Sequence, residues 1–195
     1  MRERPIIFSG PMVRAILDGR KTMTRRVIKP QPYDEYKTVM GIPLLSWRGC
    51  KGWDRERMIT LCNYGVPGDL LWVRETWREG RLNTDAPIYR EASERNIIST
   101  NCKLVKWRPS IYMPRRASRI TLEVTDVRVE RVQEITCADA IAEGTLTPAH
   151  SQVYRKHTMN HDSFSDLWDS LNAKRGYGWD VNPWVWVISF KRIKP

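Results

Sequence analysis

The chain has 195 residues, which fits a single domain with elaborations because domains commonly contain about 100–200 residues. Its 33 Lys and Arg residues outnumber its 22 Asp and Glu residues, and the formal net charge of +11 favours an anionic partner such as nucleic acid. No apolar run reaches the ~20 residues that cross a bilayer, and no signal peptide opens the chain. We therefore expect a cytoplasmic protein without a membrane partner.

The chain begins with a predicted strand, helix and strand. Residues 4–8 form a short apolar run that predicts a strand. Residues 11–17 start with a proline and carry an apolar stripe at helical spacing, and Gly19 follows as a left-handed cap, so we predict a short helix there. The next strand starts near Thr22 and ends before the prolines at positions 30 and 32, which stop regular pairing.

Lys21, Thr24 and Arg26 are the first candidate functional residues. Thr24 and Arg26 are two apart and share a strand face, whereas Lys21 and Thr24 share a pocket only if the chain after Gly19 is still turning. A hydroxyl, an amine that burial can neutralise and a guanidinium suit acyl transfer or phosphate binding. The alternative is a basic strand with solvated ends, because Lys and Arg are usually surface residues.

Residues 33–66 are predicted to form a hairpin insertion. Residues 41–47 and 58–62 have strand composition, and a stretch rich in Gly, Trp and charge separates them. Trp47 and Trp53 lie near cations in the sequence, so either they stack on bases or they form a minor core under the hairpin.

A turn at residues 67–69 precedes a strand predicted over residues 70–77. One face of this strand holds Leu71, Val73, Glu75 and Trp77. A carboxylate on an apolar face is either paired or functional, so Glu75 is a candidate to line a pocket, with Arg74 or Arg26 as its partner across a sheet.

Residues 78–105 are interpreted as a surface excursion, and residues 106–116 mix cations, aromatics and two prolines. The second segment suits a loop over a nucleic-acid groove, with Arg108 on a phosphate and Trp107 or Tyr112 on a base. A rim loop whose aromatics only pack is the alternative.

Residues 119–132 give the clearest strand signal in the chain. Apolar residues alternate at even positions up to Val124 and at odd positions from Val127. The change of phase predicts a bulge near residues 125–126, as in a strand that curls around a small barrel.

A short helix follows, with Thr136 and Asp139 as a capping box and Gly144 at its end. Glu143 lies in the last turn, where a negative charge opposes the helix dipole by about 0.3–1 kcal/mol. Glu143 therefore has a partner or a function, unless it is simply exposed to solvent.

The C-terminal part is predicted to hold a second helix and a closing strand. A capping box at Ser163 and Asp166 and apolar residues at helical spacing predict the helix. Tyr177 and Trp179 lie in the glycine-rich turn after it. Either they form a lid that stacks on a base, or they only pack within the turn. Residues 184–190 are apolar on both faces, which predicts a strand that is central or covered by a helix.

Residues 19–26, Gly-Arg-Lys-Thr-Met-Thr-Arg-Arg, resemble the GxKxxExR signature of ASCH domains, which are PUA-related β-barrels associated with RNA. Thr24 stands where that signature has its common Glu. In this respect the motif is similar to the small bacterial ASCH enzymes of the N4-acetylcytidine amidohydrolase type, whose loop has the pattern Gly-Arg-Lys-Thr-x-Thr. The whole chain also resembles ASCH-domain proteins of phages and prophages.

The resemblance continues in order along roughly half of the chain. The matching segments are residues 67–73, 118–132, 140–144 and 185–190. It implies an α+β fold, with a single small PUA-like barrel over residues 1–195, short flanking helices, and hairpin or loop insertions at about 33–66 and 78–117.

The resemblance also implies a reaction, the hydrolysis of an acyl amide on the exocyclic nitrogen of cytosine in a nucleoside or in RNA. Thr24 is the implied nucleophile, Lys21 its base, and Glu143 the acidic group that orients Lys21 or the amide or gives a proton to the leaving amine. The candidate substrate-binding residues are Arg26, Glu75, Trp77, Arg108 and Trp179. The reaction requires no metal or cofactor, and the four cysteines form no CxxC pair that would predict zinc.

Two other functions stay open. A barrel with the same cleft can serve as a non-catalytic module that captures RNA or a nucleotide, and a phage protein of this kind can also bind a host protein. RNA cleavage is a third possibility, compatible with basic residues beside a general base.

Overall fold

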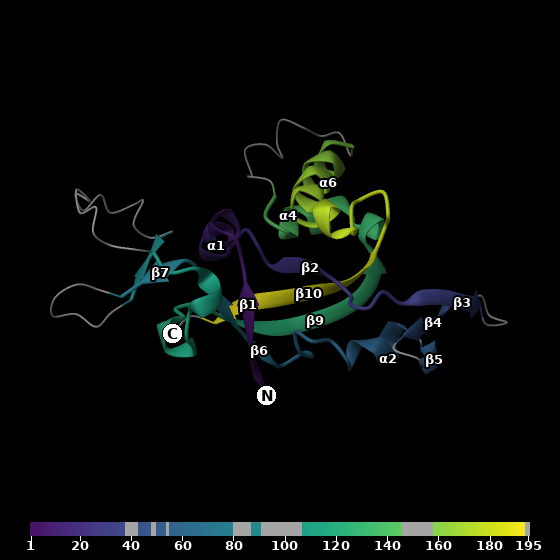
Figure 1. Cartoon of the computed structure of the whole chain (residues 1–195), viewed down its shortest axis with the longest axis horizontal. Coiled ribbons are helices and arrows are strands. Elements are labelled where there is room, and N and C mark those ends of the chain that lie inside the picture. Colours follow the sequence, from purple (N-terminus) through teal and green to yellow (C-terminus); the bar gives the residue numbers. More distant parts are fainter. Residues whose placement is uncertain are drawn as a thin grey trace.

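A curved five-stranded sheet organises the molecule (Figure 1). The computed structural model describes residues 1–37, 43–47, 50–53, 55–79, 87–90, 107–145 and 158–193. The strand order is β1 (Glu3–Ile7), β6 (Leu70–Arg74), β9 (Thr121–Arg131), β10 (Trp184–Ile193) and β2 (Met23–Val27). β1 and β6 are parallel, and the other neighbours are antiparallel.

The α+β content is as expected, but the sheet is open rather than a closed barrel. In the part of the chain that the structure describes, its edge strands β1 and β2 are not hydrogen-bonded to each other. A side chain crosses between them instead, because Nη2 of Arg26 donates to the carbonyl oxygen of Ile7 at 2.6 Å. The cavity described below is lined by residues of both edge strands.

Two smaller sheets and several short helices complete the fold. The small sheets are β3 (Tyr33–Lys37) with β4 (Pro43–Trp47) and β5 (Cys50–Trp53), and β7 (Trp77–Arg78) with β8 (Ile88–Tyr89). The helices are α1 (Gly10–Leu17), α2 (Arg55–Ile59), α4 (Cys137–Ala142) and α6 (Thr158–Asn172). The 3₁₀ turns are η1 (Ser110–Tyr112), η2 (Arg115–Ala117), η3 (Val132–Glu134) and η4 (Ala173–Arg175). Among the described residues no helix is both long and apolar enough to cross a membrane.

Helices α1 and α4 occur where the sequence predicts them, but two other predictions need correction. The segment predicted as a strand over residues 58–62 begins inside α2 and continues as a turn. Met58 and Cys62 both enter the main core, the cluster of buried apolar side chains that also holds Ile28, Leu71 and Trp186. The amides of Leu61 and Cys62 donate to the carbonyl oxygens three residues earlier, at 2.9 and 3.0 Å, so the backbone turns here instead of extending as a strand. Helix α6 begins at Thr158, five residues before the capping box predicted at Ser163.

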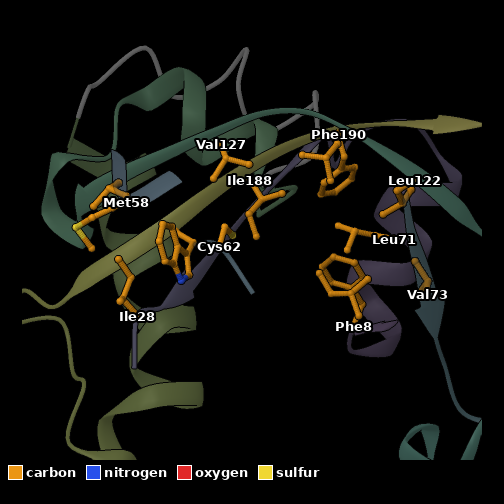
Figure 2. Close-up of a cluster of buried hydrophobic side chains, with 14 of the residues drawn as sticks. Phe8, Ile28, Met58, Cys62, Leu71, Val73, Leu122, Val127, Ile188 and Phe190 are labelled. Atoms are coloured by element: carbon orange, nitrogen blue, oxygen red, sulfur yellow. The ribbon is translucent and has the colours of Figure 1, made fainter. Parts of the chain in front are cut away.

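Strand β10 is central and buried on both faces, as its sequence predicts. Val185 and Val187 pack against a cluster that includes Phe164 and Trp168 of α6. Alternate residues, among them Trp186 and Ile188, enter the main core on the opposite face (Figure 2). The two layers of side chains fix where β10 and its neighbour β2 lie.

The bulge predicted near residues 125–126 is confirmed. Ser189 pairs with Asp126 and Phe190 with Val124, so Thr125 is the extra residue of β9. Regular alternation along β10 places Phe190 on the face of the main core, with Trp186 and Ile188, and the extra residue lies in β9 opposite it. Figure 2 shows Phe190 near Phe8, and their ring centroids are 6.1 Å apart.

Trp47 belongs to the core. Its side chain is buried, and its Nε1 donates to the carbonyl oxygen of Pro30 at 2.7 Å. Its ring meets that of Trp186 edge-on at 5.9 Å. Of the two alternatives for Trp47, stacking on a base or packing in a core, the structure therefore supports packing. The side chain of Trp53 is not among those that the structure describes.

Candidate active site

The turn between α1 and β2 places the candidate nucleophile and base. Gly19 has a left-handed backbone (φ 75°), and the amide of Lys21 donates back to the carbonyl of Ala15 at 3.0 Å. The chain is therefore still turning at Lys21, which is the condition under which Lys21 and Thr24 can serve one site. Both side chains are buried, and β2 begins at Met23, between them.

Lys21 is buried against Glu143, the residue that follows α4. Nζ of Lys21 donates to Oε2 of Glu143 at 2.7 Å and to its carbonyl oxygen at 2.8 Å, and the Lys21 side chain is 0% exposed. Burial lowers the pKa of Lys21, as do the charges of Arg26 and Arg25, whereas Glu143 raises it; the net shift is downward. The lowered pKa favours the neutral amine that a general base requires.

Glu143 is buried and not exposed to solvent at the helix end. Its Oε2 binds Lys21, while its buried Oε1 lies 3.6 Å from Nη1 of Arg25 and has no hydrogen-bond donor among the described residues. Glu143 also lines the cavity. A neutral lysine can donate both hydrogens to Glu143 and keep its lone pair.

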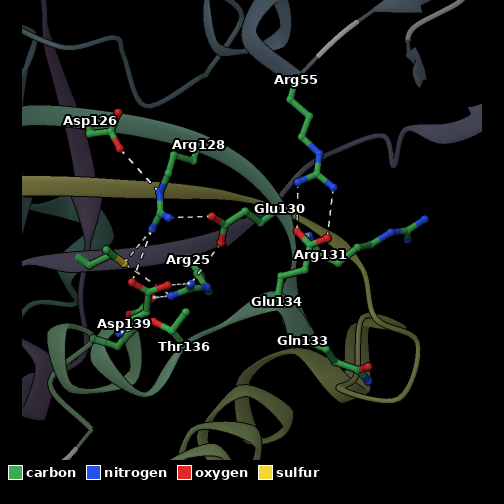
Figure 3. Close-up of polar contacts among 12 residues, drawn as sticks. Arg25, Arg55, Asp126, Arg128, Glu130, Arg131, Gln133, Glu134, Thr136 and Asp139 are labelled. Atoms are coloured by element: carbon green, nitrogen blue, oxygen red, sulfur yellow. Dashed lines mark hydrogen bonds and ion pairs between the residues drawn. The ribbon is translucent and has the colours of Figure 1, made fainter. Parts of the chain in front are cut away.

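Arg25 ties β2 to β9 and α4 (Figure 3). Its Nη2 is 2.7 Å from Asp139 and 3.3 Å from Glu130, and the Arg25 side chain is 1% exposed. Burial raises the pKa of Asp139, but the hydrogen bond and charge of Arg25, with Arg128 nearby, more than offset that effect, so its pKa is lowered. Motif and spacing did not reveal this role of Arg25, because its three acidic neighbours lie more than a hundred residues away in sequence.

Thr24 lines the cavity from β2. It is 3% exposed and pairs with Ile188 of β10. Its hydroxyl makes no hydrogen bond to any described residue, and the hydroxyl oxygen is not fully buried. The hydroxyl is therefore free to meet a ligand.

The cavity has a volume of about 670 Å³, within the range of small-molecule sites, about 300–1,000 Å³. The residues that line it come from β2, the end of β1, α6 and η4, among other segments. They include the aromatic rings of Phe8, Tyr64, Phe164, Trp168 and Trp186. The sequence predicts that the apolar stripe of α6 packs on the core, and in the structure part of this stripe also borders the cavity.

The candidate residues of the sequence analysis separate into two groups. Thr24, Arg26, Glu75 and Glu143 line the cavity, and Lys21 lies behind Glu143. Arg26 is held between the rings of Phe8, at 5.1 Å, and Tyr64, at 5.9 Å. Desolvation lowers the pKa of Arg26, in part offset by Tyr64 and Glu143.

Glu75 lines the cavity but is held by Arg119, not by Arg74 or Arg26 as the sequence suggests. Arg119 binds both carboxylate oxygens, at 2.9 and 2.8 Å, and its guanidinium lies 4.2 Å from the Tyr89 ring centroid. The Arg74 side chain instead donates to the carbonyl oxygen of Ile111. Arg119 lies just before β9, and only the fold brings it to Glu75.

Trp77, Arg108 and Trp179 are not among the described residues that line the cavity. Trp77 is buried in a separate cluster with Met113, and Arg108 pairs with Glu79 at 3.1 Å. Trp179 packs edge-on against Phe164 at 6.1 Å.

Comparisons with known proteins identify no family for the chain. No family profile and no curated protein matches it. Among solved structures it is similar to protein EF3133 from Enterococcus faecalis, which carries the family designation DUF984. The identity is 9% and the TM-score 0.46, with 99% of this chain and 81% of that chain covered.

Proposed function

We propose that this protein is an amidohydrolase of the ASCH, PUA-like type, which removes an acyl group from the exocyclic N4 of cytidine. The observation that carries the proposal is the buried contact of Lys21 with Glu143. Glu143 lines the same cavity as Thr24, whose hydroxyl has no hydrogen-bond partner among the described residues. An amine with a lowered pKa, three residues from a buried threonine, supplies the base and the hydroxyl that an activated nucleophile requires.

In the proposed reaction Thr24 Oγ attacks the acyl carbonyl, and its proton passes to Lys21. The tetrahedral intermediate collapses when the C–N4 bond breaks and the departing nitrogen takes the proton held by Lys21, which yields cytidine and an acyl-threonine ester. Glu143 holds Lys21 through Oε2 and lines the cavity in which the leaving nitrogen would lie. Attack of water on the ester then releases the acid and restores Thr24.

The test is the hydrolysis of N4-acetylcytidine by the purified protein, followed by chromatography of cytidine and acetate. Thr24→Val keeps the side-chain shape and removes the hydroxyl, and we expect turnover to fall to background. The matched variant Thr24→Ser keeps a nucleophilic oxygen, and we expect it to retain turnover. Unchanged turnover by Thr24→Val would exclude Thr24 as nucleophile.

The second candidate is a non-catalytic module that captures RNA or a nucleotide, favoured by the formal charge of +11. It predicts no turnover of any acylated cytidine by the wild-type protein. It also predicts salt-sensitive RNA binding that survives Thr24→Val. That pair of results would replace the amidohydrolase with the binding module.

A further inference from the structure

The cavity carries more positive than negative charge, and its carboxylates are already paired. Its charged lining residues are Arg25, Arg26, Lys29, Arg175, Glu75 and Glu143. Glu75 is bound by Arg119, which is not among the described residues of the lining, and Glu143 by Lys21 from behind the wall. Among the cations that line the cavity, only Arg25 lies within ion-pair distance of carboxylates of the described residues.

Arg26, Lys29 and Arg175 contribute positive charge that no ion pair among the described residues neutralises, although Glu143 attracts Arg26 from a longer distance. Within the described ranges none of the three has a carboxylate within ion-pair distance. Arg26 uses Nη2 on the carbonyl of Ile7, and its buried Nε has no acceptor. Nζ of Lys29 lies 4.9 Å from the ring centroid of Tyr177, which contacts the cation but does not neutralise it. Arg175 ends η4 and lines the same cavity.

We infer that the cavity binds a phosphate next to the base, so that the substrate is a phosphorylated cytidine and not the free nucleoside. The inference rests on the proposed function for the identity of the base. Arginine and lysine are the usual phosphate-binding side chains, the first as a planar fork and the second as a point charge. The aromatic rings of the walls supply the apolar surface that a base needs.

The phosphate can come from a mononucleotide or from an RNA strand, since both present it beside the sugar. Arg26 leads directly from Thr24 along β2, with one residue between them, and Lys29 follows just beyond the strand. A ligand with its reacting amide at Thr24 thus has Arg26 two residues along the strand, and Lys29 and Arg175 in the lining of the same cavity.

The experiment is titration calorimetry of cytidine, cytidine 5′-monophosphate and a short cytidine-containing RNA with the full chain. These ligands lack the acyl group, so the readout does not depend on hydrolysis. We expect the monophosphate to bind at least about tenfold more tightly than cytidine, and the advantage to shrink as salt rises. Lys29→Gln and Arg175→Gln should each reduce the advantage several-fold, whereas Arg192→Gln, at an exposed arginine outside the lining, should leave it unchanged.

The outcomes separate this inference from the proposed function. Equal binding of cytidine and its monophosphate, or no binding of either, overturns the phosphate site, whether or not N4-acetylcytidine is hydrolysed. A phosphate advantage without hydrolysis overturns the amidohydrolase and leaves the phosphate site standing. RNA that binds more tightly than the mononucleotide, with the same loss in Lys29→Gln, identifies the strand as the phosphate source, and equal binding identifies the mononucleotide.

Discussion

Two buried carboxylates line the same cavity, but they are held in opposite ways. Glu75 receives two parallel hydrogen bonds from Arg119, which is 25% exposed, and so both of its oxygens are used. Glu143 receives Lys21 on one oxygen, and its other oxygen, near Arg25, has no hydrogen-bond donor in the described part of the chain.

The difference separates a structural pair from a reactive one. Arginine stays protonated in proteins, so the Glu75–Arg119 pair stays fixed in charge and geometry. Lysine can lose its proton when buried, and the pKa of Lys21 is lowered. Of the two pairs, only the one between Lys21 and Glu143 has a cation with a lowered pKa that can give up its proton.

The largest expected effect contrasts the two carboxylates directly. Glu143→Gln should reduce kcat for N4-acetylcytidine by about 10²–10⁴-fold, the usual contribution of a general acid or base. Glu75→Gln keeps the shape of the other pair and should reduce kcat far less. Steady-state kinetics measure kcat for both variants, and circular dichroism verifies that both are folded. Equal losses would assign the two carboxylates the same role.

Removing one partner of each pair should affect stability unequally. Lys21→Met leaves Glu143 buried without its cation, and we expect a loss of about 3–5 kcal/mol in the free energy of unfolding. The double variant Lys21→Met/Glu143→Met should lose less, because no unpaired charge remains. Arg119→Met should also lose less, because its site is partly open to water. Urea denaturation measures all three, and a double variant less stable than Lys21→Met would contradict the assignment.

Gly144 tests how closely Lys21 is packed. A Cβ at Gly144 would lie 3.0 Å from the Cβ atoms of both Lys21 and Ala15, whereas one at Gly176 would meet nothing within 4 Å. Both glycines are left-handed, with φ of 75° and 80°, so each alanine variant carries a backbone cost of roughly 1–2 kcal/mol. We expect Gly144→Ala to be the less stable of the two and the one that loses activity. Thermal unfolding and turnover are the measurements, and matching losses would show that Lys21 tolerates the displacement.

The smallest expected effect is a shift in the pH dependence of kcat. Turnover needs the neutral amine of Lys21, so kcat should rise with pH and level off above the Lys21 pKa, below the ordinary lysine value of about 10.4. Arg26→Gln removes a charge that lowers this pKa, so the inflection should move to higher pH. Arg119→Gln, beside the other carboxylate, should leave it in place. If the inflection in kcat stays at the same pH in Arg26→Gln, it reports the titration of a group other than Lys21.

Local patterns predicted the elements near the site well. The proline start and Gly19 end of α1, the Thr136 cap of α4 and the extra residue in β9 each depend on a few neighbouring residues. Glu75 is buried as predicted, but it lies between β6 and β7 and not within a single strand over residues 70–77, and the sequence did not identify its partner. The 58–62 prediction was wrong because a short apolar run fits both periods, and Met58 and Cys62, four residues apart, share a face in a helix and in a strand alike.

The sequence by itself therefore determined the turn that carries Lys21 and Thr24, and the strand, helix and bulge patterns around it. Tertiary structure decided that the sheet stays open at β1 and β2, and that Glu143, 122 residues from Lys21, is buried against it. It also decided that Arg119, and not Arg74, neutralises Glu75. The physical reason is that periodicity reports only which face a residue occupies, whereas an ion pair in a desolvated site depends on which distant segments fold onto that face.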